Sequence, residues 1–226
     1  MDRTFFLYGI HYFREVVQPM SSPLIVSVPT TERVIAFTFD DGPNPVYTPQ
    51  VLELFREVGG KATFFMIGSQ IDANPTLAEQ VYAEGHELGN HTYTHPFLTR
   101  LTHDEARAEL VRADERIRRI TGKPVQVFRP PFFDANDEIY ALADELGYHC
   151  IGANNLAAKD WEMPGTDHIV EHSRSSAAGG SIFIFHDGFG DRSQSVEAVR
   201  ILLSELSEAG YRFVTVSEIL ALAEAE

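Results

Sequence analysis

The sequence predicts an α/β fold, a single domain built on a barrel of about seven parallel strands. Short apolar runs alternate with stretches of helical periodicity, and neither a repeat nor a low-complexity linker divides the 226 residues. Right-handed crossovers leave two arrangements, an open doubly wound sheet or a barrel. The first strand is not followed by G-x-G-x-x-G, and P-loop spacing is absent, so a nucleotide-binding fold has no support. A barrel of seven strands, or eight with one from the N-terminal stretch, fits the number of apolar runs, which is seven.

Seven apolar runs are expected to form the strands. Residues 1–23 are set apart as an N-terminal extension because Pro19 and Pro23 close them, and the folded domain is expected over 24–226. The runs, in order, are VIAFTF (34–39), ATFFMIG (62–68), HELGN (86–90), VQVFR (125–129), YHCIGA (148–153), SIFIFH (181–186) and YRFVTV (211–216).

Helical periodicity fills four of the intervals between these runs. Thr48 followed by Pro49 indicates an N-cap with proline at the first helical position. Thr102 and Glu105 have the spacing of a capping box, and Gly147 is placed to end a helix. The apolar residues of the four helices are expected within 51–58, 106–120, 139–146 and 196–206.

The charge balance and the cysteine count exclude several classes of partner. The chain has 18 basic and 33 acidic residues, a net charge of −15, which argues against nucleic acid and against an anionic membrane surface. No window reaches the ~18 apolar residues of a membrane span. Cys150 is the only cysteine, so an internal disulfide and a CxxC zinc pattern are both excluded.

The N-terminal sequence MDRTFFLYGIHYFREVV bears on localisation. Asp2, His11 and Arg14 interrupt it before a signal-peptide core of ~7–15 apolar residues is complete. The chain as it stands is therefore expected to be cytoplasmic, and extracytoplasmic if the N-terminus is truncated.

Polar or proline-constrained residues follow five of the expected strands. Active sites of parallel α/β proteins lie at the carboxyl ends of the strands, so these residues are expected to face one mouth. They are Asp40-Asp41, His91 with His95, Arg129-Pro130-Pro131-Phe132, Asp160-Trp161 and His186.

The aspartate pair and the two histidines each allow two interpretations. Asp-Gly-Pro is strong turn chemistry, so Asp40-Asp41 alone marks a turn as readily as a site. His91 and His95 alone could be two loop histidines. Together with Asp41, however, they make a set of two histidines and one carboxylate, which binds divalent metals and leaves positions for water and substrate.

The remaining candidates are also ambiguous one by one. His186 either caps a buried strand or acts as a general acid, and Arg129 is either a surface charge or the holder of a carboxylate. The two prolines after Arg129 carry no N–H, so the next backbone donor, at Phe132, is available for an oxyanion. Trp161 is either a core residue or one wall of a cleft.

Taken in order, the motifs TFDDGPNPVYTP, NHTYTH, RPPF, DW and IFH resemble the five motifs of the polysaccharide deacetylases, which are carbohydrate esterase family 4 and contain the NodB-homology domain. The resemblance runs from about Val34 to about Leu222. It implies a distorted (β/α) barrel, a catalytic domain within 24–226, and metal-dependent removal of acetyl groups from sugars.

Carried over residue by residue, the resemblance implies a metal site and two proton carriers. Asp41, His91 and His95 match the metal ligands of the family, for zinc or alternatively cobalt, nickel or manganese. Asp40 matches the catalytic base, and His186 matches the general acid.

The resemblance also implies supporting roles for five further residues. Arg129 matches the arginine that orients the base, and Asp160 matches the residue that tunes the catalytic histidine. The Phe132 backbone N–H matches the oxyanion donor, Trp161 the groove wall, and Ile184 the pocket for the acetyl methyl group.

Three departures from the family pattern concern the shape of the groove rather than the proton carriers. The family often has an aspartate where this chain has Ala157, and glycine where it has Phe133. Ile184 replaces the more common leucine.

The expected activity is hydrolysis of acetamido groups on N-acetylglucosamine-containing glycans, namely chitooligosaccharide, chitin or peptidoglycan. Three alternatives remain at this point: a metal-dependent amidase for a small non-carbohydrate amide, an O-deacetylase for acetylxylan, and a non-catalytic carbohydrate-binding module that keeps a structural metal. The expected partner is an acetylated carbohydrate, with neither nucleic acid nor membrane, and the chain is expected to be a monomer.

Overall fold

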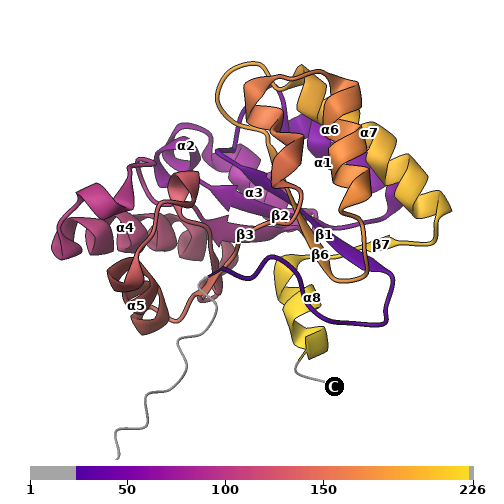
Figure 1. Ribbon diagram of the computed structural model, residues 1–226. Coiled ribbons are helices and arrows are strands. Elements are labelled where there is room, and N and C mark those ends of the chain that lie inside the picture. Colours follow the sequence, from indigo (N-terminus) through magenta and orange to yellow (C-terminus); the bar gives the residue numbers. More distant parts are fainter. Residues whose placement is uncertain (1–23, 224–226) are drawn as a thin grey trace, which may run out of the picture.

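The structure, a computed structural model, describes residues 24–223. Its centre is a sheet of seven parallel strands in the order β5-β4-β3-β2-β1-β6, with β7 also paired to β1 (Figure 1). Each predicted apolar run contains one strand, so the predicted α/β fold with a sheet of about seven parallel strands is confirmed. The strands are β1 Val34–Asp40, β2 Thr63–Met66, β3 Glu87–Asn90, β4 Val127–Phe128, β5 His149–Cys150, β6 Ser181–His186 and β7 Arg212–Phe213.

The sheet curls, and residues 24–28 bridge its two edge strands. Ile25 pairs with Ile151 just beyond β5, while Ser27 pairs with Ser181 at the start of β6. This crossing passes so close to Gly180 that a Cβ there would lie 1.8 Å from the Val28 carbonyl oxygen. The distorted barrel is therefore closed by two isolated bridges rather than by a full eighth strand. The predicted extension, 1–23, lies outside the described residues.

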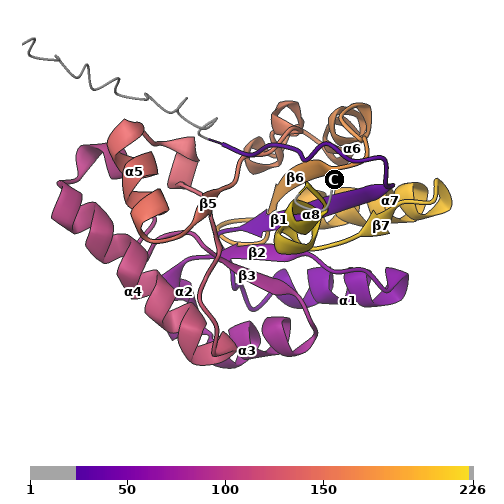
Figure 2. The same cartoon turned by 90° about the horizontal axis from the view of Figure 1, so that it is seen from below.

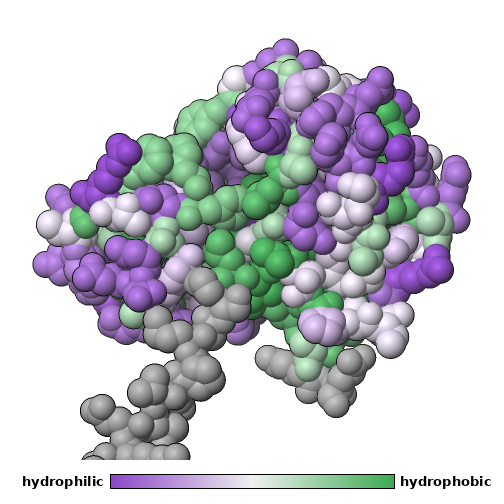
Figure 3. All heavy atoms as spheres, in the orientation of Figure 1, coloured by the Kyte–Doolittle hydropathy of each residue, from purple (hydrophilic) through white to green (hydrophobic). Residues whose placement is uncertain are grey.

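Eight α-helices surround the sheet within the described residues (Figures 1 and 2). Seven lie outside the sheet, and α8 lies below it in Figure 1 and so in front of its middle in Figure 2. The helices are α1 Thr48–Val58, α2 Gly68–Ala73, α3 Pro75–Ala83, α4 His103–Thr121, α5 Asp137–Glu145, α6 Thr166–Ser175, α7 Ser193–Glu208 and α8 Val216–Ala223. Figure 3 shows hydrophilic side chains over the helices at both sides of this face and apolar ones gathered between them.

The helix boundaries confirm some of the capping predictions and correct others. Thr102 and Glu105 form the predicted capping box of α4, and Gly147 follows α5 with φ of 78°. The predicted N-cap at Thr48 is wrong, because Tyr47 occupies that position and Thr48 is the first helical residue. The Thr48 hydroxyl is instead buried and donates a hydrogen bond to Asp187 at 2.5 Å.

Side chains along β1 alternate between two hydrophobic cores, as the two-residue period of a strand requires. The outward residues join a large core between sheet and helices: Ile35, Phe37 and Phe39. The inward residues Val34 and Ala36 join a smaller core inside the barrel, which Val216 and Ile219 of α8 close from below. The inward series continues to Asp40 at the carboxyl end, where it pairs in register with His186 of β6. Both side chains therefore reach the mouth of the barrel.

One buried histidine makes stability depend on pH. His86 is 3% exposed, and its Nδ1 accepts a hydrogen bond from the Ala62 N–H at 3.1 Å. Burial lowers the pKa of His86 from 6.5 to about 4. Between these values the unfolded chain binds more protons than the folded one, so stability falls as the pH drops from 6.5 towards 4. At about 1.36 kcal/mol per pKa unit, the loss is of the order of 3 kcal/mol.

The substitution His86→Asn tests this prediction, because the asparagine amide oxygen can take the place of Nδ1 as acceptor for the Ala62 N–H. Urea unfolding at pH 7 and at pH 4.5 should show a smaller loss of stability in the variant than in the unmodified protein. An identical loss in both proteins would contradict the assignment to His86.

Candidate metal centre and active site

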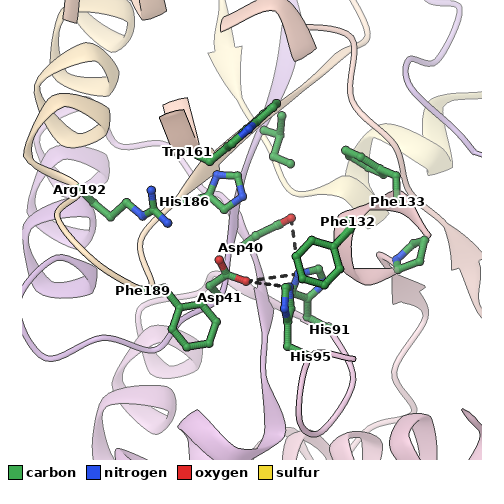
Figure 4. A pocket seen from close by; sticks show the side chains of 12 residues that line it. Asp40, Asp41, His91, His95, Phe132, Phe133, Trp161, His186, Phe189 and Arg192 are labelled. Carbon is green, nitrogen blue, oxygen red and sulfur yellow. Dashed lines mark ion pairs between the residues drawn. The ribbon is translucent and has the colours of Figure 1, made fainter. Parts of the chain in front are cut away.

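The carboxyl ends of the strands surround a cavity of about 620 Å³ (Figure 4). Segments after five strands contribute to it, which confirms that the predicted strand-end residues share one mouth. Arg129 and Asp160 lie directly behind the wall, where they hold Asp40 and His186. The lining residues are Asp40, Asp41, His91, His95, Pro130, Phe132, Phe133, Trp161, Ile184, His186, Phe189 and Arg192.

Asp41, His91 and His95 bring three potential metal donors together within 4.8 Å of one another. Asp41 Oδ1 lies 3.5 Å from His91 Nε2 and 3.2 Å from His95 Nε2. This buried oxygen accepts no hydrogen bond from any described residue. A buried carboxylate oxygen without a donor, facing two imidazole nitrogens, is the arrangement expected around a divalent cation. The three residues therefore fit the metal site that the sequence predicts.

The protonation states of these residues suit metal binding. His91 Nδ1 lies 2.7 Å from the Arg129 carbonyl oxygen, which can only accept, so Nδ1 carries the proton and Nε2 is free to ligate. Burial lowers the pKa of His95 to about 4 and keeps its ring neutral. Burial alone would raise the pKa of Asp41, but the neighbouring histidines, His91 foremost, hold it below its usual value. The ligand set is thus two imidazoles and one carboxylate.

Backbone geometry holds the ligand residues in place. Asp41 and His95 both have positive φ values, 74° and 62°, which cost non-glycine residues about 1–3 kcal/mol each. Gly188 packs against Asp41 so closely that a Cβ would lie 2.1 Å from the Asp41 carbonyl oxygen. The loops after β1 and β6 therefore lock each other in place.

Asp40 is held from below by Arg129, whose side chain is fully buried. Arg129 Nη1 donates to Asp40 Oδ1 at 2.7 Å and to Thr38 Oγ1 at 2.6 Å. Its other nitrogens donate to the carbonyl oxygens of Ile151 and Gly152. Arg129 is therefore the rigid carboxylate partner and not a surface charge, and it leaves Asp40 Oδ2 directed at the metal site, 3.8 Å from His91 Nε2.

His186 is held from behind by Asp160. His186 Nδ1 lies 2.8 Å from Asp160 Oδ1, and the second carboxylate oxygen accepts from the His186 backbone N–H and from Ser195 Oγ. Burial alone would lower the pKa of His186, but the Asp160 carboxylate outweighs it and raises the pKa to about 9. The imidazole is thus protonated near neutral pH, with Nε2 available to the cavity. The Trp161 ring stands 5.7 Å from it.

Aromatic side chains form the walls of the cavity. Phe132 is 55% exposed and stacks on Phe97 at 4.1 Å between ring centroids, while Trp161 and Phe189 line other parts of the mouth. Phe132 has a φ of 58°, and no described residue accepts a hydrogen bond from its backbone N–H. Phe133, one of the departures from the family pattern, also lines the cavity.

Sequence reasoning missed Phe189, Arg192 and Ser195, which lie beyond the sixth strand. Phe189 and Arg192 lie in the loop that follows His186 at the carboxyl end of β6, so the position of this loop is the signal that points to them. Ser195 had no such signal, because it lies on α7 and meets Asp160 only through tertiary packing.

The fold and the site define a class of protein, a (β/α) fold with a candidate metal site at the carboxyl ends of a curled parallel sheet. The chain belongs to the polysaccharide deacetylase family, whose sequence model matches residues 27–151. The resemblance inferred from the five motifs is therefore confirmed, and so is the prediction of an enzyme.

Individual relatives agree with this assignment. The peptidoglycan-N-acetylglucosamine deacetylase of Bacillus cereus is 43% identical over 194 residues, which are 85% of this chain and 91% of that protein. The chitooligosaccharide deacetylase of Sinorhizobium fredii is 33% identical and matches 78% of this chain and 87% of its own length. The crystal structure of the Bc1960 peptidoglycan N-acetylglucosamine deacetylase with 4-naphthalen-1-yl-N-oxidanyl-benzamide has a TM-score of 0.82 and 29% identity, covering 87% of this chain and 92% of that one.

Within the described residues, none of the helices has the length and apolar character needed to cross a membrane.

Proposed function

We propose that this chain hydrolyses the acetamido group of N-acetylglucosamine residues in a glycan, releasing acetate and a free amine. One observation carries the proposal: Asp40 and His186 are register partners on β1 and β6, and each is held by a buried partner of opposite charge beside the Asp41, His91 and His95 cluster. A base and an acid of this kind, adjacent to a metal site, are what amide hydrolysis requires.

Asp41, His91 and His95 would hold the ion, and their mixed nitrogen and oxygen donors favour zinc, with cobalt, nickel or manganese as alternatives. When bound, a divalent ion supplies Lewis-acid chemistry, which polarises a carbonyl oxygen and lowers the pKa of water.

Asp40 accepts the proton of the attacking water. Arg129 occupies Asp40 Oδ1, so the proton goes to Oδ2, the oxygen directed at the metal site. The water oxygen forms a bond to the acetyl carbon, and negative charge moves to the former carbonyl oxygen. In this proposal the Phe132 N–H, unpaired among the described residues, donates a hydrogen bond to that oxygen.

His186 donates its proton to the amide nitrogen as the carbon–nitrogen bond breaks. Its pKa of about 9 keeps the proton available near neutral pH, and Asp160 on Nδ1 leaves Nε2 to make the transfer. The products are acetate and the amine of the sugar. Trp161 and Ile184 line the space for the sugar ring and the acetyl methyl group.

The names of the relatives support a glycan substrate, because these enzymes are named as deacetylases of peptidoglycan and of chitooligosaccharide. An exposed tryptophan beside the acid also suits the apolar face of a sugar ring. The amidase, acetylxylan and non-catalytic alternatives are decided by one assay. Zinc-loaded protein should release acetate from N-acetylglucosamine oligomers, lose this activity with a chelator and regain it with zinc. Acetate release from acetylxylan alone, or from no glycan, would overturn the proposal.

The acid role of His186 predicts an effect that depends on the leaving group. The variant His186→Ala should release acetate from an N-acetylglucosamine oligomer roughly 10²–10⁴-fold more slowly, because an amine cannot leave unprotonated. Hydrolysis of an aryl acetate, whose phenolate leaves without a proton, should fall much less. Equal losses on both substrates, at unchanged metal content, would show that His186 does something other than protonate the leaving group.

A further inference from the structure

Arg192 lines the cavity but has no part in the chemistry described above. It immediately precedes α7, is 8% exposed, and donates from Nε to the Gly188 carbonyl oxygen at 2.7 Å. No described residue accepts a hydrogen bond from its Nη atoms or forms an ion pair with it. In Figure 4 the guanidinium points into the pocket. The nearly buried guanidinium of Arg192 thus presents its two Nη atoms, unpaired among the described residues, to a ligand in the cavity.

The position of this cation is fixed relative to the metal ligands. The Gly188 carbonyl that holds Arg192 belongs to the loop locked against Asp41, and the Gly188 N–H donates to the Asp40 carbonyl oxygen at 3.3 Å. The neighbouring acid, Asp191, is exposed, and its Oδ1 accepts hydrogen bonds from the Tyr47 hydroxyl and the Ser193 N–H. Among the described residues Asp191 forms no ion pair with Arg192, and the bond to Gly188 keeps the guanidinium from swinging away.

The other charged groups of the cavity already have partners. Asp40 pairs with Arg129, His186 pairs with Asp160, and Asp41 belongs to the metal cluster. A nearly buried guanidinium without an anion incurs a desolvation cost, which an arriving carboxylate offsets through two parallel charge-assisted hydrogen bonds. Arg192 therefore has the features of one half of a carboxylate-binding pair.

We propose that Arg192 forms a carboxylate subsite, which binds an acidic substituent of the glycan close to the N-acetyl group being removed. The inference rests on the proposed deacetylase function and names its substrate class: an N-acetylated glycan whose sugars carry carboxylates, such as the lactyl ether group of muramic acid. A neutral chitooligosaccharide carries no carboxylate, so water would remain bound to the Nη atoms of Arg192.

The test compares one sugar skeleton with and without its charge. The probes are an N-acetylglucosamine–N-acetylmuramic acid tetrasaccharide with free lactyl carboxylates and its methyl ester. The unmodified enzyme should show a kcat/KM for the acid about tenfold or more above that for the ester, since hydrogen bonds to charged groups contribute about 1.5–3 kcal/mol. In Arg192→Gln the ratio should fall to near one. Arg200→Gln, on the outward side of α7 where Arg200 pairs with Glu197, should keep the ratio of the unmodified enzyme.

A binding measurement separates this subsite from the catalytic proposal. In an Asp40→Asn background, calorimetry should give a lower Kd for the acid than for the ester, and adding Arg192→Gln should remove the difference. If acetate is released but the ratio is the same with and without Arg192, the subsite is refuted and the deacetylase function stands. If neither probe loses acetate yet the Kd difference depends on Arg192, the function fails and the subsite stands.

Discussion

The variant Asp40→Asn should retain the metal and the fold but release acetate roughly 10²–10⁴-fold more slowly than the unmodified enzyme. Asparagine has the size of aspartate, and its amide oxygen can still accept the hydrogen bond from Arg129 Nη1. What the variant loses is the basic oxygen directed at the metal site, so the attacking water keeps its proton. The expected loss lies in kcat, with little change in KM, because the proton moves only in the transition state.

Two measurements distinguish this result from a loss of activity caused by loss of the metal or by an unspecific effect of removing a carboxylate. Metal content by elemental analysis should match that of the unmodified protein, because Asp41, His91 and His95 are untouched. The matched control Asp104→Asn removes one carboxylate from an exposed position at the start of α4 and should leave kcat unchanged. An Asp40→Asn enzyme within tenfold of the control, at full metal content, would show that another group accepts the proton.

Most of the site could be predicted because it follows from strand periodicity. Residues two apart on a strand share a face, so Asp40 had to continue the inward series of Val34, Ala36 and Thr38, and polar residues at neighbouring strand ends had to meet. The family resemblance then assigned roles that spacing alone left open. Arg129 shows the limit: sequence placed it at a strand end, but only the packing shows its side chain fully buried beneath Asp40.

Helix and strand ends were harder to predict where tertiary contacts compete with local signals. Thr48 was predicted to cap α1, but its hydroxyl is taken by the buried Asp187, whose second oxygen has no partner among the described residues. The last strand was expected to run to residue 216, yet Val216 begins α8. The overlooked signal was Thr215 three residues before Glu218, whose reciprocal hydrogen bonds start that helix.

The variant Arg129→Met should destabilise the fold by about 3–5 kcal/mol, the cost typical of removing one partner from a buried ion pair. Methionine fills a similar space but donates no hydrogen bond, so Asp40 is left as an uncompensated buried carboxylate. Thr38 and the carbonyl oxygens of Ile151 and Gly152 lose their donors at the same time. Urea unfolding of the metal-free protein measures the effect without any contribution from ligand binding.

The double variant Arg129→Met with Asp40→Asn shows how much of that cost comes from the isolated charge. Since the asparagine is neutral, the double variant should be more stable than Arg129→Met alone, even though it carries one more substitution. The carbonyl oxygens of Ile151 and Gly152 remain without donors in both proteins, so the recovery should be partial. If the double variant were no more stable than the single one, the unmet acceptors rather than the Asp40 charge would account for the loss. The pair would then serve to orient the base without compensating a buried charge.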